Sequence, residues 1–174
     1  EKKVYAAGTT EHNSPEEKTS GRERLGMAMK AVLINPRGHL FGKNERLSAF
    51  LAASPVMASF RRFWMAPCLG LLAIAAYFPD EWEISYTDEN LREINFDEPC
   101  DLVCLSAMTA QAPRAYEIAD AFRERGVTTV MGGIHAALLP EEAALHADVV
   151  LAGEGEVLFP RFLEDFRAGC CSRI

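Results

Sequence analysis

Three short apolar runs, each ending in a loop of small residues, constrain this chain most. The runs DLVCLSA, VTTVMGG and DVVLAGEGE occupy residues 101–107, 127–133 and 148–156. They are rich in valine and leucine and are separated by segments with a helical period, which is typical of buried strands in a parallel sheet. A ligand of such a sheet lies beyond the carboxyl ends of the strands, so we expect function at these loops.

The loops at the ends of the runs form the candidate site. They consist mostly of small or polar residues, namely Ser106, Ala107, Met108 and Thr109, then Gly132, Gly133, Ile134 and His135, then Gly153, Glu154, Gly155 and Glu156. Glycine has no Cβ, so a ligand can approach its backbone closely and φ can be positive. Loops of this kind predict a site for a large, flat ligand.

The rest of the chain completes an alternation of strands and helices. Further strands are predicted at residues 30–35 (KAVLIN), which Pro36 ends because it lacks an N–H, and at residues 82–88 (WEISYTD). Helices are predicted at residues 113–126, in a short segment that opens at Pro140, and at residues 158–167. The pattern predicts an α/β fold with a doubly wound, five-stranded parallel sheet of flavodoxin-like (Rossmann-like) order 2-1-3-4-5.

The strongly apolar stretch at residues 47–78 is interrupted by proline and arginine, so no run reaches the roughly 20 residues that span a bilayer. A helix is predicted there with Pro67 in its first turn and its end near Phe78, apolar nearly all round because it is buried. Aromatic residues such as Phe63 and Trp64 precede it. They are either core packing under a long loop or an apolar wall over a planar ligand.

Composition and missing motifs argue against several functions. A net charge of -7 without clustered Lys and Arg argues against a nucleic-acid surface. Neither GxGxxG nor GxxxxGKS/T follows the first strand, which removes the main support for nicotinamide or nucleoside triphosphate binding, and Asp88 is then expected to cap a turn. Five cysteines without a preceding secretory signal favour a reduced, cytoplasmic protein with no disulfide framework.

One α/β domain is predicted at residues 29–168. The length of 174 residues suits a single domain, and a hydrophobic content of 49% is ample for one core. Residues 1–24, which make up most of residues 1–28, are polar and show no apolar period. They cannot repay the entropy of ordering by burial, so we expect a flexible N-terminal extension.

A resemblance to a known family runs through most of the chain. It is carried by residues 105–156, LSAMTAQAPRAYEIADAFRERGVTTVMGGIHAALLPEEAALHADVVLAGEGE, which resemble the amino-terminal cobalamin-binding domain of the cobalamin-dependent radical S-adenosylmethionine enzymes. The resemblance begins near Ala31 with the INP turn, continues through residues 67–90 and reaches Phe166. The motifs are specific as a set, although a Gly-Gly pair or a GEGE loop alone occurs widely.

The resemblance implies that cobalamin lies across the carboxyl ends of the strands, with its nucleotide tail inserted into the crevice of the sheet. Ser106 can hydrogen-bond the buried tail, or its hydroxyl can bond its own strand. The glycine pair can equally form an ordinary tight turn, and Glu154 and Glu156 can be solvated carboxylates at a helix start. The implied cofactor-binding residues are Asn35, Pro36, Arg37, Ser106, Met108, Thr109, Gly132, Gly133, His135, Gly153, Glu154 and Gly155.

A histidine ligand to cobalt is typical of the mutase and methionine synthase branch of cobalamin proteins, which carries DxHxxG after the first strand. The corresponding residues here are Arg37, Gly38, His39, Leu40, Phe41 and Gly42, so arginine stands in the aspartate position. Without that carboxylate the imidazole lacks the partner that orients it and raises its basicity. We therefore predict no protein ligand to the metal, with His39 only a weak candidate, and a loop hydrogen bond for His135.

The resemblance also implies a radical S-adenosylmethionine domain, in the same or another chain, whose CxxxCxxC cysteines hold an iron-sulfur cluster. Here Cys100 and Cys104 have the first spacing but Ala107 occupies the third position, so the cluster and S-adenosylmethionine are assigned to that absent domain. Residues 169–174 are expected to begin a linker toward it. The chain is then a fragment, a truncated product or a stand-alone carrier.

The leading hypothesis is a cobalamin-binding module for methyl transfer or related radical chemistry, which presents cobalt to a radical domain and does not catalyse alone. Two alternatives stay open. One is a flavin- or nucleotide-binding flavodoxin-like protein whose GG and GEGE loops serve phosphates, although these loops lack basic residues. The other is a cofactor-free interaction module that uses its exposed helix faces. Neither nucleic acid nor a membrane is expected as a partner.

Overall fold

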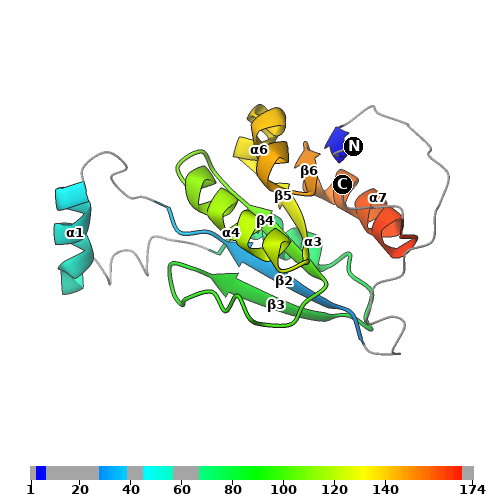
Figure 1. The fold of residues 1–174 in the computed structure, drawn as a ribbon, viewed down its shortest axis with the longest axis horizontal. Coiled ribbons are helices and arrows are strands. Elements are labelled where there is room, and N and C mark those ends of the chain that lie inside the picture. The colour runs from blue at the N-terminus through cyan, green and yellow to red at the C-terminus, as the bar shows by residue number, and fades with distance from the viewer. Residues whose placement is uncertain (1–2, 7–27, 39–44, 57–66, 170–174) are drawn as a thin grey trace.

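The fold is built on one parallel sheet. The computed structural model describes residues 3–6, 28–38, 45–56 and 67–169 of the chain. Within these residues the sheet has six strands, all parallel, in the order β1-β6-β5-β4-β2-β3 (Figure 1). The strands are β1 (Lys3–Ala6), β2 (Lys30–Asn35), β3 (Glu83–Asp88), β4 (Leu102–Ser106), β5 (Thr128–Gly132) and β6 (Val149–Ala152).

The five strands that the sequence predicts, and their order, are confirmed. They are β2 to β6, so the predicted order 2-1-3-4-5 corresponds to β3-β2-β4-β5-β6. The central strands β4 and β5 are buried over most of their length, which explains why their sequences are continuous apolar runs rather than alternating ones.

The sequence does not predict the sixth strand, β1. It comes from the segment assigned to the flexible extension, and it pairs in parallel with β6 from Lys3↔Val149 to Ala6↔Ala152. A run of four residues carries little periodic signal, and its pairing depends on the edge of β6, which is distant in the sequence. Residues 7–27, which make up most of the expected extension, lie outside the described residues.

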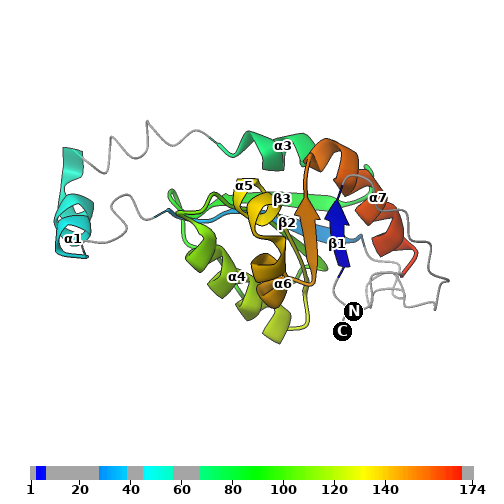
Figure 2. The ribbon, with the colours of Figure 1, turned by 90° about the horizontal axis from the view of Figure 1, so that it is seen from above.

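Helices cover both faces of the sheet (Figure 2). α3 (Leu69–Ala75) and α7 (Gly155–Arg167) lie on one face, and α4 (Ala112–Glu124) and α6 (Pro140–His146) lie on the other. The short helix α5 (Ile134–Leu138) follows β5. The remaining described helix, α1 (Glu45–Ala53), lies away from the sheet in both views.

Each face of the sheet has its own apolar core. The predicted amphipathic helix is confirmed as α4, which buries Ile118 and Phe122 together with alanines. On the opposite face α7 buries Phe159 and Phe162, whose ring centroids are 5.7 Å apart. The sheet therefore separates two packed layers, and its carboxyl edge is shared by both.

Helix α3 is shorter than predicted and is half exposed. It begins after Pro67 rather than including it, and it ends before Phe78. Leu71 and Ile74 are buried, whereas Leu69 is 74% exposed. The prediction of a helix buried on nearly all sides is therefore wrong, because α3 packs with one face on the sheet and α7, and no described residue covers its other face.

Two more helices, both starting at the carboxyl edge of the sheet, differ from the prediction: one is not predicted and the other starts earlier. Helix α5 is not predicted, because five residues are too few to show a helical period. Helix α7 begins at Gly155 rather than at residue 158, so the second half of the GEGE motif lies in its first turn. Within the described ranges, no helix is long and apolar enough to cross a membrane.

Candidate functional site

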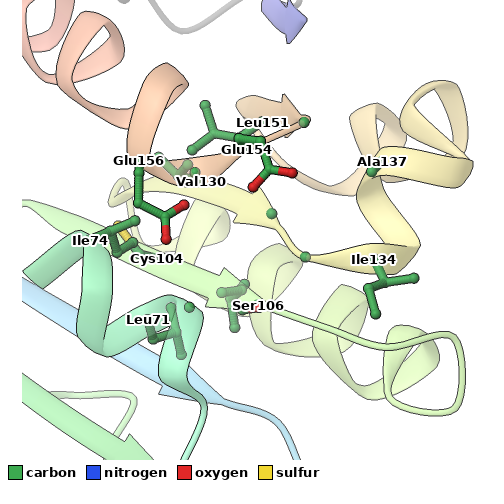
Figure 3. A pocket seen from close by; sticks show the side chains of 16 residues that line it. Leu71, Ile74, Cys104, Ser106, Val130, Ile134, Ala137, Leu151, Glu154 and Glu156 are labelled. Atoms are coloured by element: carbon green, nitrogen blue, oxygen red, sulfur yellow. The ribbon is translucent and has the colours of Figure 1, made fainter. Parts of the chain in front are cut away.

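A cavity opens at the carboxyl ends of β4, β5 and β6. It lies between α3 and the starts of α5 and α7 and has a volume of about 400 Å³ (Figure 3). Small-molecule sites commonly have volumes of about 300–1,000 Å³, so this cavity can hold part of a large ligand. Its lining residues are Gly70, Leu71, Ile74, Cys104, Leu105, Ser106, Val130, Gly132, Gly133, Ile134, Ala137, Leu151, Gly153, Glu154, Gly155 and Glu156.

The cavity forms because the side chains become smaller toward the end of each strand. Residues i and i+2 of a strand point to the same face of a sheet. On the face under α3 and α7, a larger residue in each of the three strands is followed two positions later by a smaller one, which for β6 lies just after the strand end. These pairs are Cys104 and Ser106, Val130 and Gly132, and Leu151 and Gly153. The strand register aligns Ser106 with Gly132, so the small residues lie together at the mouth.

The floor and one wall of the cavity are apolar. In the floor, Cys104 and Val130 are each 1% exposed. The wall is formed by Leu71 and Ile74 of α3, which face the strands in Figure 3. At the start of α7, a Cβ added to Gly155 would lie 3.3 Å from Ile74 Cγ2, which is tighter than an ordinary contact. Glycine at this position therefore lets α3 and α7 come close together.

Cys104 is a buried thiol in the floor. Burial raises the pKa of this thiol, so the sulfur stays protonated at physiological pH. A protonated thiol is only a weak hydrogen-bond donor and acceptor. Among the described residues, no group of three or more His, Cys, Asp and Glu side chains could hold a metal ion. Cys104 therefore behaves here as a small apolar side chain.

The polar groups of the cavity lie at its mouth. The Ser106 side chain lines the cavity (Figure 3). Its hydroxyl has no hydrogen-bond partner in the described part of the chain, including its own strand. Glu154 is the N-cap residue of α7 and Glu156 lies in its first turn. Both carboxylates are exposed, and neither has an ion-pair partner among the described residues. Carboxylates are favourable at a helix start, so this position is stable without a cation.

Gly132 and Gly133 have different structural roles. Gly133 has a φ of 91°, and a Cβ there would lie 2.8 Å from the backbone nitrogen of Ala107 and 2.8 Å from Ser106 Oγ. The fold itself therefore requires glycine at residue 133, in agreement with the tight turn that the sequence left open beside the approach of a ligand. A Cβ at Gly132 would lie 3.8 Å from Leu151 Cβ, an ordinary contact on the cavity side.

Half of the predicted site residues line the cavity and half do not. The residues that line it are Ser106, Gly132, Gly133, Gly153, Glu154 and Gly155. The others are at the same edge of the sheet but are absent from the lining, namely Asn35, Pro36, Arg37, Met108, Thr109 and His135.

Asn35 belongs to a buried hydrogen-bond network that joins β2, β3 and the loop after β4. Its amide nitrogen donates to Asp88 Oδ2 at 3.1 Å, and its oxygen accepts from Gln111 Nε2 at 3.2 Å. The same Gln111 nitrogen donates to the carbonyl of Pro36 at 2.6 Å, and Gln111 Oε1 accepts from the Met108 N–H at 2.9 Å. Gln111 connects these loops and was not among the predicted site residues.

Arg37 is tied to the sheet edge through Glu89. The Glu89 side chain is only 5% exposed and accepts from the Arg37 N–H at 3.0 Å. Glu89 Oε1 also accepts from Arg114 Nη2 at 2.6 Å and Oε2 accepts from Arg114 Nε at 3.2 Å, which makes a bidentate ion pair. The neighbouring Asp88 accepts from the Asn90 N–H at 2.8 Å, so it caps a turn as predicted.

His135 is buried and makes the loop hydrogen bonds that the sequence predicts. Its Nε2 lies 2.7 Å from the Tyr116 hydroxyl, and its Nδ1 lies 3.4 Å from Thr109 Oγ1. The Tyr116 hydroxyl also donates to Glu142 Oε1 at 3.1 Å. The backbone N–H of His135 also donates to the Ala107 carbonyl at 3.1 Å. His135 thus holds the loops after β4 and β5 together.

One predicted residue lies outside the described part of the chain, and four apolar lining residues were not predicted. His39 and residues 40–42 lie outside the described residues, so the absence of a histidine ligand to cobalt stays a prediction. The apolar lining residues Leu71, Ile74, Val130 and Leu151 were not among the predicted site residues. The two-residue spacing from a larger to a smaller side chain at three strand ends is the sequence signal that could have found the strand members of this set.

These features define a class of protein: an α/β domain with a flavodoxin-like sheet and a ligand cavity at the carboxyl ends of its strands. The model of the B12 binding domain family matches residues 64–163. The chain therefore belongs to the B12-binding domain family, and cobalamin is its cofactor, as the sequence analysis expected. The flavin and cofactor-free alternatives are not favoured.

Curated relatives of the chain are methyltransferases by name. The bacteriochlorophyllide d C-8(2)-methyltransferase of Chlorobaculum tepidum is 42% identical over 98 residues, which cover 56% of this chain and 22% of that protein. The hopanoid C-2 methylase of Rhodopseudomonas palustris is 32% identical over 99 residues, which cover 56% of this chain and 18% of that protein. An uncharacterized methyltransferase of Synechocystis is 29% identical over 144 residues, which cover 81% of this chain and 25% of that protein. The matched region thus spans a quarter or less of each relative, and no solved structure matches the chain significantly.

Proposed function

We propose that the cavity receives the nucleotide tail of cobalamin. The observation that carries this proposal is the position of the cavity, which lies at the strand ends inside the region that matches the B12 binding domain. Its apolar floor suits an aromatic base, its glycines leave room beside the backbone, and the Ser106 hydroxyl is available to a polar atom of the ligand. The residues assigned to the tail are Ser106, Gly132, Gly133, Gly153, Glu154 and Gly155.

The other predicted residues act outside the cavity in this proposal. Arg37, Met108 and Thr109 are exposed at the same edge, where they can contact the rest of the cofactor. The buried residues support these loops through hydrogen bonds to Gln111 and Tyr116. These supporting residues are Asn35, Pro36 and His135.

The module serves a cobalamin-dependent radical S-adenosylmethionine methyltransferase. The similarity to methyltransferases supports this assignment, and the 174-residue sequence contains no CxxxCxxC motif. The iron-sulfur cluster and S-adenosylmethionine therefore belong to a radical domain in the same or another chain. Bound cobalamin supplies a cobalt centre that can carry a methyl group.

The free thiols of Cys68 and Cys104 support a reduced, cytoplasmic setting for the protein.

Cofactor retention tests this function directly. The chain is mixed with hydroxocobalamin or with flavin mononucleotide, free cofactor is removed by gel filtration, and the absorption spectrum of the protein fraction is recorded. We expect the protein to retain cobalamin and to release the flavin. Retention of the flavin alone, or of neither cofactor, would contradict the proposal.

The Ser106→Ala variant tests where the tail binds. One hydrogen bond contributes about 0.5–1.5 kcal/mol, so its loss should weaken cobalamin binding between about twofold and tenfold. Ser85→Ala is the matched control, because the Ser85 Oγ on β3 is buried and unpaired within the described residues but does not line the cavity. Titration calorimetry should show weaker cobalamin binding for Ser106→Ala only. An equal loss of affinity in both variants would show that Ser106 does not contact the tail.

A further inference from the structure

The floor of the cavity has almost no hydrogen-bonding capacity. It is formed by buried side chains that are aliphatic or, at Cys104, a protonated thiol. The backbone cannot supply partners either, because β4 pairs on both sides and β5 pairs on both sides in the parallel ladder. Any polar atom that reaches the floor therefore loses its water and gains no partner.

The mouth of the cavity has the opposite character. It carries the unpaired Ser106 hydroxyl and the exposed carboxylates of Glu154 and Glu156. Two carboxylates without a described cation repel the phosphodiester of a cobalamin-type tail, which disfavours a phosphate inside the cavity. The base at the end of the tail is then the part that enters.

We infer that this cavity selects cobamides by the base of their nucleotide tail, and that it favours a benzimidazole over a purine. This inference rests on the proposed function, because it concerns the same cavity. A dimethylbenzimidazole has one free ring nitrogen, which suits the single hydroxyl of Ser106, and its other edge consists of carbon and methyl groups. That edge matches the floor at Cys104, Val130 and Leu151.

A purine fits the same floor poorly. Adenine carries ring nitrogens in both of its rings and an exocyclic amine, so at least one polar atom faces the apolar floor when another reaches Ser106. The carboxylates are too exposed to serve that buried edge, since they lie at the helix start beside solvent. A single unpaired polar group should lower affinity at least tenfold, which corresponds to about 1.4 kcal/mol.

The test measures dissociation constants of the 174-residue chain for two probes, cobalamin and the cobamide that carries adenine in its tail. Both probes are supplied in the dicyano form, in which neither base is bound to cobalt. They then differ only in the base, so contacts to the corrin ring cancel in the ratio. We expect cobalamin to bind at least tenfold more tightly. Equal affinity for both would overturn the inference while leaving cobalamin binding intact, whereas failure to bind either probe would overturn the proposed function itself.

A pair of variants then locates the selectivity. Val130→Thr places a hydroxyl in the floor without changing the shape of the side chain, and it should reduce the preference for cobalamin at least threefold. Val103→Thr is the matched control, because Val103 is equally buried on a central strand but belongs to the core on the opposite face of the sheet. If the ratio of the two dissociation constants is unchanged in Val130→Thr, or changes equally in both variants, the floor of the cavity does not determine the selectivity.

Discussion

The two sides of the carboxyl edge use their polar groups in opposite ways. Toward α3 and α7 the edge is hollow, and the Ser106 hydroxyl has no partner in the described chain. Toward α4 the edge is filled, and the side chains of Asn35, Gln111 and His135 are hydrogen-bonded to neighbouring loops. Both sides belong to one set of strand ends, and the sequence alone treats them alike.

This difference separates binding from support. An unpaired polar group beside a cavity can gain a ligand hydrogen bond, whereas a group that is already paired in the interior mainly stabilises the fold. Substitutions on the hollow side should therefore change cofactor affinity, and substitutions on the filled side should change the free energy of unfolding. Substitutions at Gly133, Glu89 and Tyr116 test this division, in decreasing order of expected effect.

Gly133→Val should show the largest loss of stability. The positive φ is strained for valine, and the Cβ would clash with the Ala107 backbone, so we expect the free energy of unfolding to fall by about 3 kcal/mol or more. Urea unfolding followed by circular dichroism measures this. Gly132→Val is the contrasting variant, because its Cβ has room: it should stay within about 1 kcal/mol of the parent and weaken cobalamin binding about tenfold. Similar unfolding curves for the two variants would contradict the conclusion that the fold requires glycine at residue 133 but not at residue 132.

Glu89→Gln should destabilise the filled side by about 2 kcal/mol, because it removes the charge from a buried bidentate pair with Arg114. Glu117 pairs with the same arginine at 2.6 Å but is exposed, so Glu117→Gln should change stability by only about 0.5 kcal/mol. Both variants should keep the cobalamin affinity of the parent. A loss of affinity in Glu89→Gln that exceeds its loss of stability would show that this network also contacts the cofactor.

Tyr116→Phe should have the smallest effect, about 1 kcal/mol near neutral pH, because it removes the hydroxyl that bonds His135 and Glu142. Burial, with the hydrogen bond to Glu142, raises the pKa of Tyr116 from 10.0 to about 12. The folded state then keeps a proton that the unfolded chain releases, so this contribution to the stability of the parent is lost as pH rises from 10 toward 12.

The stability difference between the parent and Tyr116→Phe should therefore shrink above pH 10. Unfolding curves at several pH values between 7 and 11.5 would show it. Tyr77→Phe serves as the control, since Tyr77 is 44% exposed and its loss should change the free energy of unfolding little. A constant difference for Tyr116→Phe across the range would mean that its hydroxyl is not buried as described.

The sequence by itself determined the strands β2 to β6, their order and the edge at which function lies. These features depend on local patterns: continuous apolar runs predict buried parallel strands, and a helical period between them predicts crossover helices. The residues of 105–156 carried the resemblance to cobalamin-binding domains, and the family match over residues 64–163 confirms it.

Only the tertiary structure decided which half of the predicted residues line a cavity. That outcome depends on the register of β4 and β5, which places Ser106 beside Gly132, and on the packing of α3 over them. It also decided that Gly133 is required by the Ala107 backbone and that β1 extends the sheet beside β6. Each of these contacts joins residues far apart in the chain, so no local period in the sequence can encode it.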